Sequence, residues 1–278
     1  MTGQETPAAD GTASKTAPLP FDTSTGHQAR MYDYVLGGKD NYAADREAVE
    51  AALKIWPEMA FTARANRAFL GRAVRYLAAE AGIRQFLDLG TGIPTAGNSP
   101  EVAQAIAPES RVVYVDYDPV VLAHARALLD SHEAGATEYI DADVRDTDTI
   151  LGQASRLLDF SKPVAVTMLT ILHAIPDADD PHAIVAKLMA AVPSGSYLAI
   201  SHAGSDLLGQ EREDSLQDAW GGRMQQQIIW RSREQVARFF EGTDLAAPGL
   251  VRVEEWRPDP GTSDEHKSSG WAAVGRKR

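Results

Sequence analysis

The sequence predicts an α/β fold built on a doubly wound, Rossmann-like sheet of seven strands. Short apolar runs alternate with helical patterns, two of these runs end in an acid, and the first acid-ended run leads into a turn with two glycines. Strands that alternate with helices form a parallel sheet, because each helix returns the chain to the starting edge. We expect a mostly parallel sheet with a C-terminal antiparallel hairpin, preceded by an N-terminal helical lid.

Composition and charge exclude several classes of protein. The 278 residues carry a net charge of −12 and include no cysteine, so disulfides, thiolate zinc sites and cysteine nucleophiles are excluded. The negative charge would repel a phosphate backbone, so a nucleic-acid partner is not expected. No apolar run approaches the roughly 18 residues of a membrane span, and the N-terminus has no signal-peptide pattern. We therefore expect a cytoplasmic protein without a membrane partner.

The chain divides into three parts. Residues 1–27 are rich in small and polar side chains and predict a disordered tail. Residues 28–82 form a helical segment or lid that ends in a helix over 58–81, where apolar side chains recur every four residues and Gly82 follows as a C-cap. Residues 83–278 form the main domain, with a helical insertion at 205–241.

Apolar runs mark the expected strands of the main domain. They cover residues 85–89, 111–115, 137–140, 164–169, 196–201, 250–256 and 271–275. Helices are expected between most of them, because Ser99-Pro100, Pro119 and Asp180-Pro181 are typical helix starts. Only a loop separates the last two strands, which predicts the antiparallel hairpin at one edge.

The turn after the first strand distinguishes between two kinds of nucleoside cofactor. A dinucleotide site needs Gly-x-Gly-x-x-Gly, but the turn reads Gly90-Thr91-Gly92-Ile93-Pro94-Thr95 and lacks the third glycine. The next helix begins late, near Pro100, and Asp88 stands where it would repel a phosphate. The turn therefore suits a cationic cofactor without phosphate, such as S-adenosylmethionine, whose ammonium group Asp88 would pair with.

Two further acids at strand ends support an adenosyl ligand. Asp116 ends the second strand and can accept hydrogen bonds from a ribose diol, and Asp143 follows the third strand and can accept one from the adenine amino group. Each acid alone is more often a cap of a helix or turn, but three at successive strand ends favour the ligand. The expected cofactor-binding residues of the main domain are Asp88, Gly90, Thr91, Gly92, Asp116, Tyr117, Asp118, Asp143, Val144, Leu169 and Thr170.

The order of these residues resembles that of the class I S-adenosylmethionine-dependent methyltransferases, although Pro94 stands where their commonest signature has another glycine. A more specific resemblance is to a bacterial family described as S-adenosyl methyltransferase, formerly a domain of unknown function. It rests on residues 29–42 (ARMYDYVLGGKDNY), 64–70 (RANRAFL) and 88–95 (DLGTGIPT). The resemblance covers about residues 28–276 and implies the fold and the cofactor, but no substrate.

The polar segment between Arg30 and Tyr42 has two interpretations. As a lid over the cofactor, it would pair a basic side chain with the cofactor carboxylate and place tyrosines beside the pocket. Otherwise it is a surface loop that its tyrosines hold to the domain. The residues expected to bind the cofactor as a lid are Arg30, Lys39, Asn41 and Tyr42.

His173 is the leading candidate for a general base. It follows the fourth strand, whose end lies beside the transferable methyl group in the methyltransferase fold, and an unperturbed histidine titrates near neutral pH. The favoured alternative is a histidine that shapes an apolar wall, and His202 after the fifth strand has the same two interpretations. No metal site is expected, because Asp180 before Pro181 is better explained as a helix cap.

The sequence thus predicts a methyltransferase that moves the methyl group of S-adenosylmethionine to an oxygen or nitrogen nucleophile of a small molecule. One alternative is an NAD(P)-dependent oxidoreductase, which needs the missing third glycine. Another is a non-catalytic protein that binds S-adenosylmethionine as a regulatory signal. The sequence leaves the acceptor and the oligomeric state open.

Overall fold

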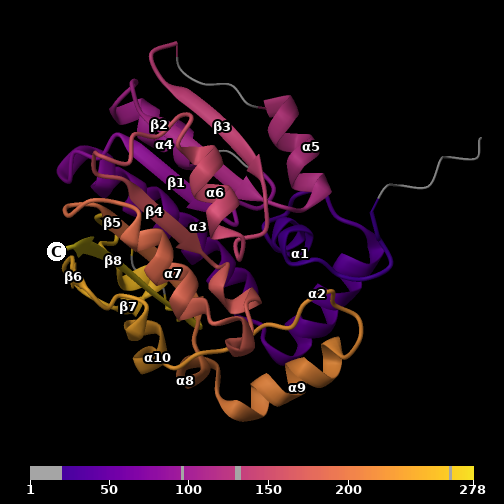
Figure 1. The fold of residues 1–278 in the computed structure, drawn as a ribbon. Coiled ribbons are helices and arrows are strands. Elements are labelled where there is room, and N and C mark those ends of the chain that lie inside the picture. The colour runs from indigo at the N-terminus through magenta and orange to yellow at the C-terminus, as the bar shows by residue number, and fades with distance from the viewer. Residues whose placement is uncertain (1–20, 95–96, 129–132, 263–264) are drawn as a thin grey trace, which may run out of the picture.

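One sheet forms the centre of the computed structural model, which describes residues 21–94, 97–128, 133–262 and 265–278. Within these residues the strand order is β3-β2-β1-β4-β5-β8-β6, and β7 also pairs with β8 (Figure 1). The strands are β1 (Gln85–Leu89), β2 (Arg111–Asp116), β3 (Ala136–Asp141), β4 (Ala165–Leu169), β5 (Tyr197–Ala203), β6 (Thr243–Leu245), β7 (Val251–Arg252) and β8 (Gly270–Lys277).

The sheet is parallel from β3 to β5 and antiparallel beyond. In β1, Phe86 lies opposite Val112 of β2 and Ala165 of β4, and both pairings are parallel. β2 with β3 and β4 with β5 are also parallel, whereas β8 runs antiparallel to β5, β6 and β7. The predicted α/β fold, with a mostly parallel sheet and an antiparallel C-terminal hairpin, is confirmed.

The predicted number of seven strands is wrong, because the described residues contain eight. β6 has only three residues, and a pattern that short is not recognisable in a sequence. The expected strand at 250–256 contributes only β7, since Val253–Glu255 form a 3-10 turn. The guanidinium of Arg72 donates to the carbonyls of Val253 (2.7 Å) and Trp256 (2.8 Å), so a helix side chain binds oxygens that a longer strand would use.

The helices are α1 (Gln28–Val35), α2 (Ala43–Ile55), α3 (Met59–Arg75), α4 (Ser99–Ile106), α5 (Pro119–Leu128), α6 (Thr147–Ala154), α7 (Pro181–Ala190), α8 (Ser205–Leu208), α9 (Gln210–Trp220) and α10 (Arg233–Arg238). The helix predicted over 58–81 is α3 together with a π-helical turn, Tyr76–Glu80, and Gly82 follows its end with φ +68°. Residues 221–231 of the predicted helical insertion contain no helix. None of the helices in the described part of the chain is long and apolar enough to cross a membrane.

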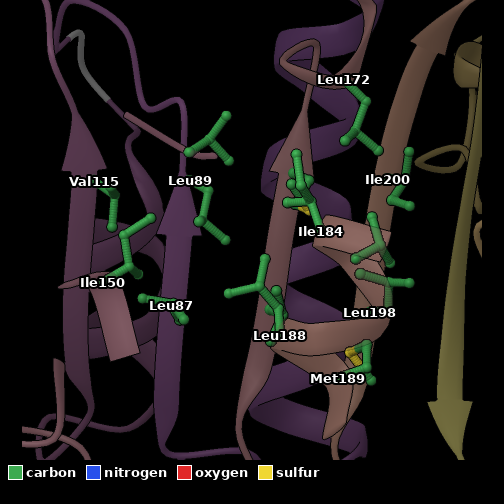
Figure 2. Close-up of a cluster of buried hydrophobic side chains, with 14 of the residues drawn as sticks. Leu87, Leu89, Val115, Ile150, Leu172, Ile184, Leu188, Met189, Leu198 and Ile200 are labelled. Carbon is green, nitrogen blue, oxygen red and sulfur yellow. The ribbon is translucent and has the colours of Figure 1, made fainter. Parts of the chain in front are cut away.

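Two hydrophobic layers cover the two faces of the sheet. On one face, Leu87 and Leu89 of β1 and Leu198 of β5 pack against α6 and α7 (Figure 2). Val236 of α10 belongs to the same cluster. On the other face, Phe86 packs against α3 and α4. Successive side chains of a strand alternate between the faces, and each fully buried large apolar side chain stabilises the fold by roughly 1.5–3 kcal/mol. Asp88 therefore lies on the face that α3 and α4 cover.

The N-terminal helices and α9 form a separate group of helices beside the sheet. α2 packs against both α1 and α9 (Figure 1), and Met31, Val49 and Trp220 of these three helices belong to one apolar cluster. The predicted disordered tail falls mostly on residues 1–20, which lie outside the described residues. Residues 21–27 of that prediction form defined contacts, since Gly26 pairs with Met224 and the ring of His27 pairs with Asp118.

Replacing Gly90 by Ala is expected to lower the free energy of unfolding by at least about 1–2 kcal/mol, the cost of a left-handed backbone for an L-residue. Gly90 has φ +72°, and a Cβ there would lie 2.6 Å from side-chain atoms of Ile171. The matched control is Gly152→Ala in α6, where a Cβ has open space and a helix favours Ala by about 0.5–1 kcal/mol. Urea denaturation measures the free energy of unfolding of both variants. Equal changes in the two would contradict the claim that the backbone at residue 90 requires glycine.

Candidate functional site

The candidate site is a cavity at the carboxyl ends of β1, β2, β4 and β5. Asp88, Asp116, Leu169 and Ser201 line it from these strands, and α1, α3 and residues 224–230 line it from the other side. The strand order reverses beside β1, and ligands of open α/β sheets bind at such a point. The cavity volume is about 200 Å³, whereas a second cavity nearby has about 10 Å³, the space of one water.

The glycine turn forms one wall of the cavity. Gly90 and Gly92 have φ values of +72° and +65°, a backbone conformation that favours glycine. The amide of Gly90 donates to the carbonyl of Val115 (2.8 Å), and the amide of Gly92 donates to Oδ2 of Asp116 (2.9 Å). The turn after β1 is therefore bound to the end of β2, and Thr91 lines the cavity between the two glycines.

Asp116 is a buried carboxylate with capacity for a ligand. Its Oδ1 accepts hydrogen bonds from the amides of Tyr117 (2.8 Å) and Asp118 (3.1 Å), and Gly92 binds its other oxygen. A carboxylate can accept about four hydrogen bonds, so one position is left for a group in the cavity. Burial raises the pKa of Asp116, which means that the ionised form lacks full solvation and would gain from a further donor.

Asp88 is the second buried carboxylate of the cavity wall. It accepts hydrogen bonds from the hydroxyls of Ser99 and Thr167, both at 2.6 Å, and it is 4% exposed. Burial raises its pKa. The N-cap of α4 is Asn98, one residue before the Ser99 cap that the sequence predicts, and the hydroxyl of Ser99 binds Asp88 instead.

Arg67 lies beside Asp88 and also lines the cavity. Its guanidinium donates to Oδ1 of Asn98 (2.5 Å). From the sequence, Arg67 could pair with a cofactor carboxylate, but an arginine on a helix surface is usually solvated, so it is not among the predicted site residues. Arg67 belongs to a second stripe of α3 with helical spacing, and this stripe lines the cavity. The pattern could have identified Arg67 as a site residue: Met59, Thr62, Ala63, Asn66, Arg67 and Leu70.

The structure does not bring the predicted lid residues to the cavity. Arg30 is 1% exposed, and its guanidinium binds the carboxylate of Asp45 (3.2 Å) and the carbonyls of Asp22 and Thr25. This pairing holds residues 22–25 against α1 and α2 and uses the donors that a cofactor carboxylate would need. The other three predicted lid residues, Lys39, Asn41 and Tyr42, also lie outside the cavity lining. The side chain of Asn41 donates to Asp33, and Tyr42 directly precedes α2. Tyr32 of the same segment does line the cavity.

Three predicted residues after β2 and β3 also lie outside the lining. The guanidinium of Arg145 binds both oxygens of Asp143 (2.9 and 2.5 Å), and these hydrogen bonds lower the pKa of Asp143. Val144 is buried in the core beside it. Asp118 accepts from the amide of Val120 and pairs with the ring of His27, so it caps α5. The neighbouring Tyr117 lines the cavity, where its hydroxyl accepts from Gln226 (2.5 Å).

Leu169 and Thr170 line the cavity at the end of β4, as do both candidate histidines. His202 has both ring nitrogens engaged, one with the carbonyl of Ala203 (2.9 Å) and one with the guanidinium of Arg231 (2.9 Å). The ring of His173 has one polar contact, from Nε2 to Oε1 of Gln28 (3.2 Å), and its Nδ1 is buried without a partner. Of the two, His173 alone has a ring nitrogen without a partner in the protein.

A hydrogen-bond network connects the N-terminal helices to the sheet along the cavity. Asn66 of α3 donates to the hydroxyl of Tyr32 (3.0 Å) and accepts from the hydroxyl of Ser201 (2.6 Å). The amide of Thr170 donates to the same Ser201 hydroxyl (3.1 Å). This network fixes the positions of α1 and α3 relative to the ends of β4 and β5.

The described residues contain no group of three or more histidines and acids that could hold a metal ion. Asp180, the acid expected to cap a helix, accepts a hydrogen bond from the amide of Ala183 (3.0 Å) at the start of α7. The helix-cap interpretation of Asp180 is therefore confirmed.

Comparison with known proteins identifies close relatives of the chain. The model of a family described as S-adenosyl methyltransferase matches residues 14–278. A DUF574 family protein from Streptomyces avermitilis is 44% identical over 92% of this chain and 99% of its own, with a TM-score of 0.88. A proposed methyltransferase from Thermobifida fusca is 39% identical over 92% of this chain and 97% of its own, with a TM-score of 0.84.

More distant structures share the fold alone. The plantazolicin methyltransferase BpumL, crystallised with a triazolic desmethylPZN analogue and S-adenosylhomocysteine, is 12% identical over 90% of this chain and 96% of its own. Its TM-score is 0.52. No curated protein matches the chain.

Acid is expected to destabilise the protein through His173. Burial, with Arg231 as a second cause, lowers the pKa of His173 from 6.5 to about 4. As the pH falls, the unfolded chain therefore binds a proton at this residue before the folded protein does. The contribution of the neutral His173 to the free energy of unfolding is constant above pH 6.5 and is lost as the pH falls from 6.5 towards 4. Urea denaturation across this range should give a smaller pH slope for His173→Gln than for the parent protein. The control is His124→Gln on α5, outside the cavity, and an unchanged slope for His173→Gln would contradict the assignment.

Proposed function

Because the chain belongs to the S-adenosyl methyltransferase family, we propose that it transfers a methyl group from S-adenosylmethionine to an oxygen or nitrogen nucleophile of a small molecule. S-adenosylmethionine-dependent methyl transfer is the activity of the family. One observation carries the proposal. Two buried carboxylates, Asp88 and Asp116, line the same cavity as the glycine turn, and the rest of this cavity is largely apolar. Ligand sites of enzymes combine a few placed polar groups with an apolar lining in this way.

The cofactor site is proposed from the polar groups at the glycine turn. Asp116, with one hydrogen-bonding position left, would bind a ribose hydroxyl, while the turn from Gly90 to Gly92 admits the ligand to the backbone. Asp88 would pair with the ammonium group, and Arg67 beside it would pair with the carboxylate. Arg67 thus takes the role that the sequence analysis gave to Arg30 and Lys39. Thr91, Tyr117, Leu169 and Thr170 line the same cavity and complete the proposed site.

The chain contributes position and desolvation to the reaction. The bound cofactor supplies a methyl group that is already activated by a sulfonium. The protein therefore needs to align the acceptor and exclude water, and it needs a proton acceptor only where the acceptor is protonated. The enclosing helices α1 and α3 and residues 224–230 fit this need. His173 is the proposed proton acceptor, and His202, with both nitrogens engaged, is a positioning group.

The alternatives differ in their ligands and products. Asp88 beside the turn and the absent third glycine argue against NAD(P), as does the family. A non-catalytic protein would bind S-adenosylmethionine but form no S-adenosylhomocysteine when small-molecule acceptors are added. The net charge of −12 supports a small molecule over a nucleic acid as acceptor, and we retain a cytoplasmic location as an expectation.

Calorimetry on the full chain should show binding of S-adenosylmethionine and S-adenosylhomocysteine, and no binding of NAD. Replacing Asp116 by Asn removes the charge that strengthens its hydrogen bond to the ribose, and should weaken S-adenosylhomocysteine binding by about tenfold or more. The matched control is Asp148→Asn on α6, an exposed acid paired with Lys187 outside the cavity. Tight NAD binding, or an Asp116→Asn variant with parental affinity, would contradict the proposed site.

Replacing Asp88 by Asn should separate binding from stability. Burial raises the pKa of Asp88 in the folded protein, so its ionised form opposes folding at neutral pH and the neutral amide should leave stability unchanged or higher. Affinity for S-adenosylhomocysteine should fall about tenfold, whereas methylthioadenosine, which lacks the ammonium group, should bind as before. Calorimetry with both ligands and urea denaturation test this, and an equal loss of affinity for both ligands would refute the pairing.

A further inference from the structure

Residues 224–230, in the segment between α9 and α10, line the cavity with alternate side chains. The segment contains no helix here. The side chains that line the cavity are those of Met224, Gln226, Ile228 and Trp230. Those that lie outside the lining are Gln225, Gln227 and Ile229. An extended backbone produces this alternation, so Gln226 is a polar side chain in an otherwise apolar row.

Backbone hydrogen bonds hold this row in place on both sides of Gln226. Before it, the amide of Gln225 donates to the carbonyl of Gly26 (3.0 Å). After it, the amide of Ile229 donates to the carbonyl of His173 (2.7 Å). The side chain of Gln226 is therefore presented to the cavity by a segment that is already fixed, which reduces the entropy that a ligand would lose by ordering it.

The side-chain oxygen of Gln226 is left for a ligand. Nε2 of Gln226 donates to the hydroxyl of Tyr117 (2.5 Å). No described residue donates to Oε1, and this oxygen keeps exposed area in a half-buried side chain. Among the described residues, the other side-chain amides of the lining have their oxygens engaged: that of Gln28 contacts a histidine nitrogen (3.2 Å), and that of Asn66 accepts from a serine hydroxyl (2.6 Å).

Tyr117 places this oxygen near the proposed ribose site. It directly follows Asp116, whose carboxylate is proposed to bind a ribose hydroxyl, and it lines the same cavity. The base of an adenosyl ligand is bonded directly to this ribose and therefore lies beside Tyr117, whose aromatic ring suits a flat base. Gln226 is bound to the hydroxyl at the far end of that ring, where the edge of the base would lie.

The acid that the sequence assigned to the base has a partner of its own. The guanidinium of Arg145 binds both oxygens of Asp143 and also Asp179 (2.8 Å), and Asp143 lies outside the cavity lining. The amino group of adenine is an N–H donor and needs an acceptor. The amide of glutamine pairs with the edge of adenine that carries this group where proteins bind DNA, so an amide oxygen is a suitable acceptor.

We propose, on the basis of the cofactor site proposed above, that Gln226 recognises the base of the cofactor: its Oε1 accepts a hydrogen bond from the 6-amino group of adenine while the base lies against the ring of Tyr117. A base with an oxygen at this position, such as hypoxanthine, brings two acceptors together and leaves both without a donor. Specificity for adenine thus comes from the segment between α9 and α10, and not from the acid after β3.

Calorimetry with two ligands that differ at position 6 of the base tests the proposal on the full chain. S-adenosylhomocysteine should bind about tenfold tighter or more than S-inosylhomocysteine, in which an oxygen replaces the amino group. Equal affinities, or a preference for the inosyl ligand, would overturn the proposal. Failure of both ligands to bind would instead refute the cofactor site on which it rests.

Variants of Gln226 test whether its side chain causes the preference for the adenosyl ligand. Gln226→Leu should remove the preference by weakening S-adenosylhomocysteine binding about tenfold, whereas Gln226→Glu, which keeps an acceptor oxygen, should retain it. Gln227→Leu, exposed and outside the lining, is the matched control. Asp143→Asn should also retain the preference.

Three results would count against the assignment: an unchanged preference in Gln226→Leu, its loss in Gln226→Glu, or its loss in Asp143→Asn. The preference is a ratio of two affinities for one preparation, so a smaller folded fraction does not imitate its loss. The two ligands on the parent protein keep the test decisive where a variant folds poorly.

Discussion

The reversal of strand order beside β1 is the constraint on which the rest of the structure depends. β1 lies between β2 and β4, and the helices that follow β1 and β3 pack on opposite faces of the sheet. The chain therefore leaves the carboxyl ends of β1 and β4 in opposite directions, which opens a crevice between them. Asp88, the last residue but one of β1, and Asp116, the last residue of β2, both line the cavity at this crevice. Their burial follows from the helices on that face, and so do their raised pKa values.

The turn after β2 also anchors the segments that close the cavity. Asp118 pairs with His27 at the start of α1, and the Tyr117 hydroxyl accepts from Gln226. Gly26 pairs with Met224, so the two closing segments also bind each other. Residues 26–27 and 224–226, far apart in the chain, thus pack together over the cavity. These contacts place Gln28 beside His173 and Trp230 against Trp56.

The sequence predicted the elements whose signals are local. Apolar runs located β1 to β5 and β8, and the acids at the ends of β1 and β2 located one wall of the cavity. The structure gives two of the predicted cofactor residues partners within the protein. The guanidinium of Arg30 binds Asp45 of the next helix, and Asp143 is bound by Arg145, two residues further along the chain. β6 was missed because three residues carry no periodicity, and it is defined only by its pairing with β8.

By itself the sequence determined the order of strands and helices, the glycine turn and the acids at strand ends, because each depends on residues adjacent in the chain. From these follow the fold and a cofactor without phosphate. Only the tertiary structure decided which polar side chains face the cavity. Gln28 and His173 are 145 residues apart, and whether a polar atom is satisfied by the protein or left for a ligand depends on neighbours that folding brings together. The part of the cavity wall that the helices and loops form is therefore a property of tertiary packing, whereas the part at the glycine turn is already present in the strands.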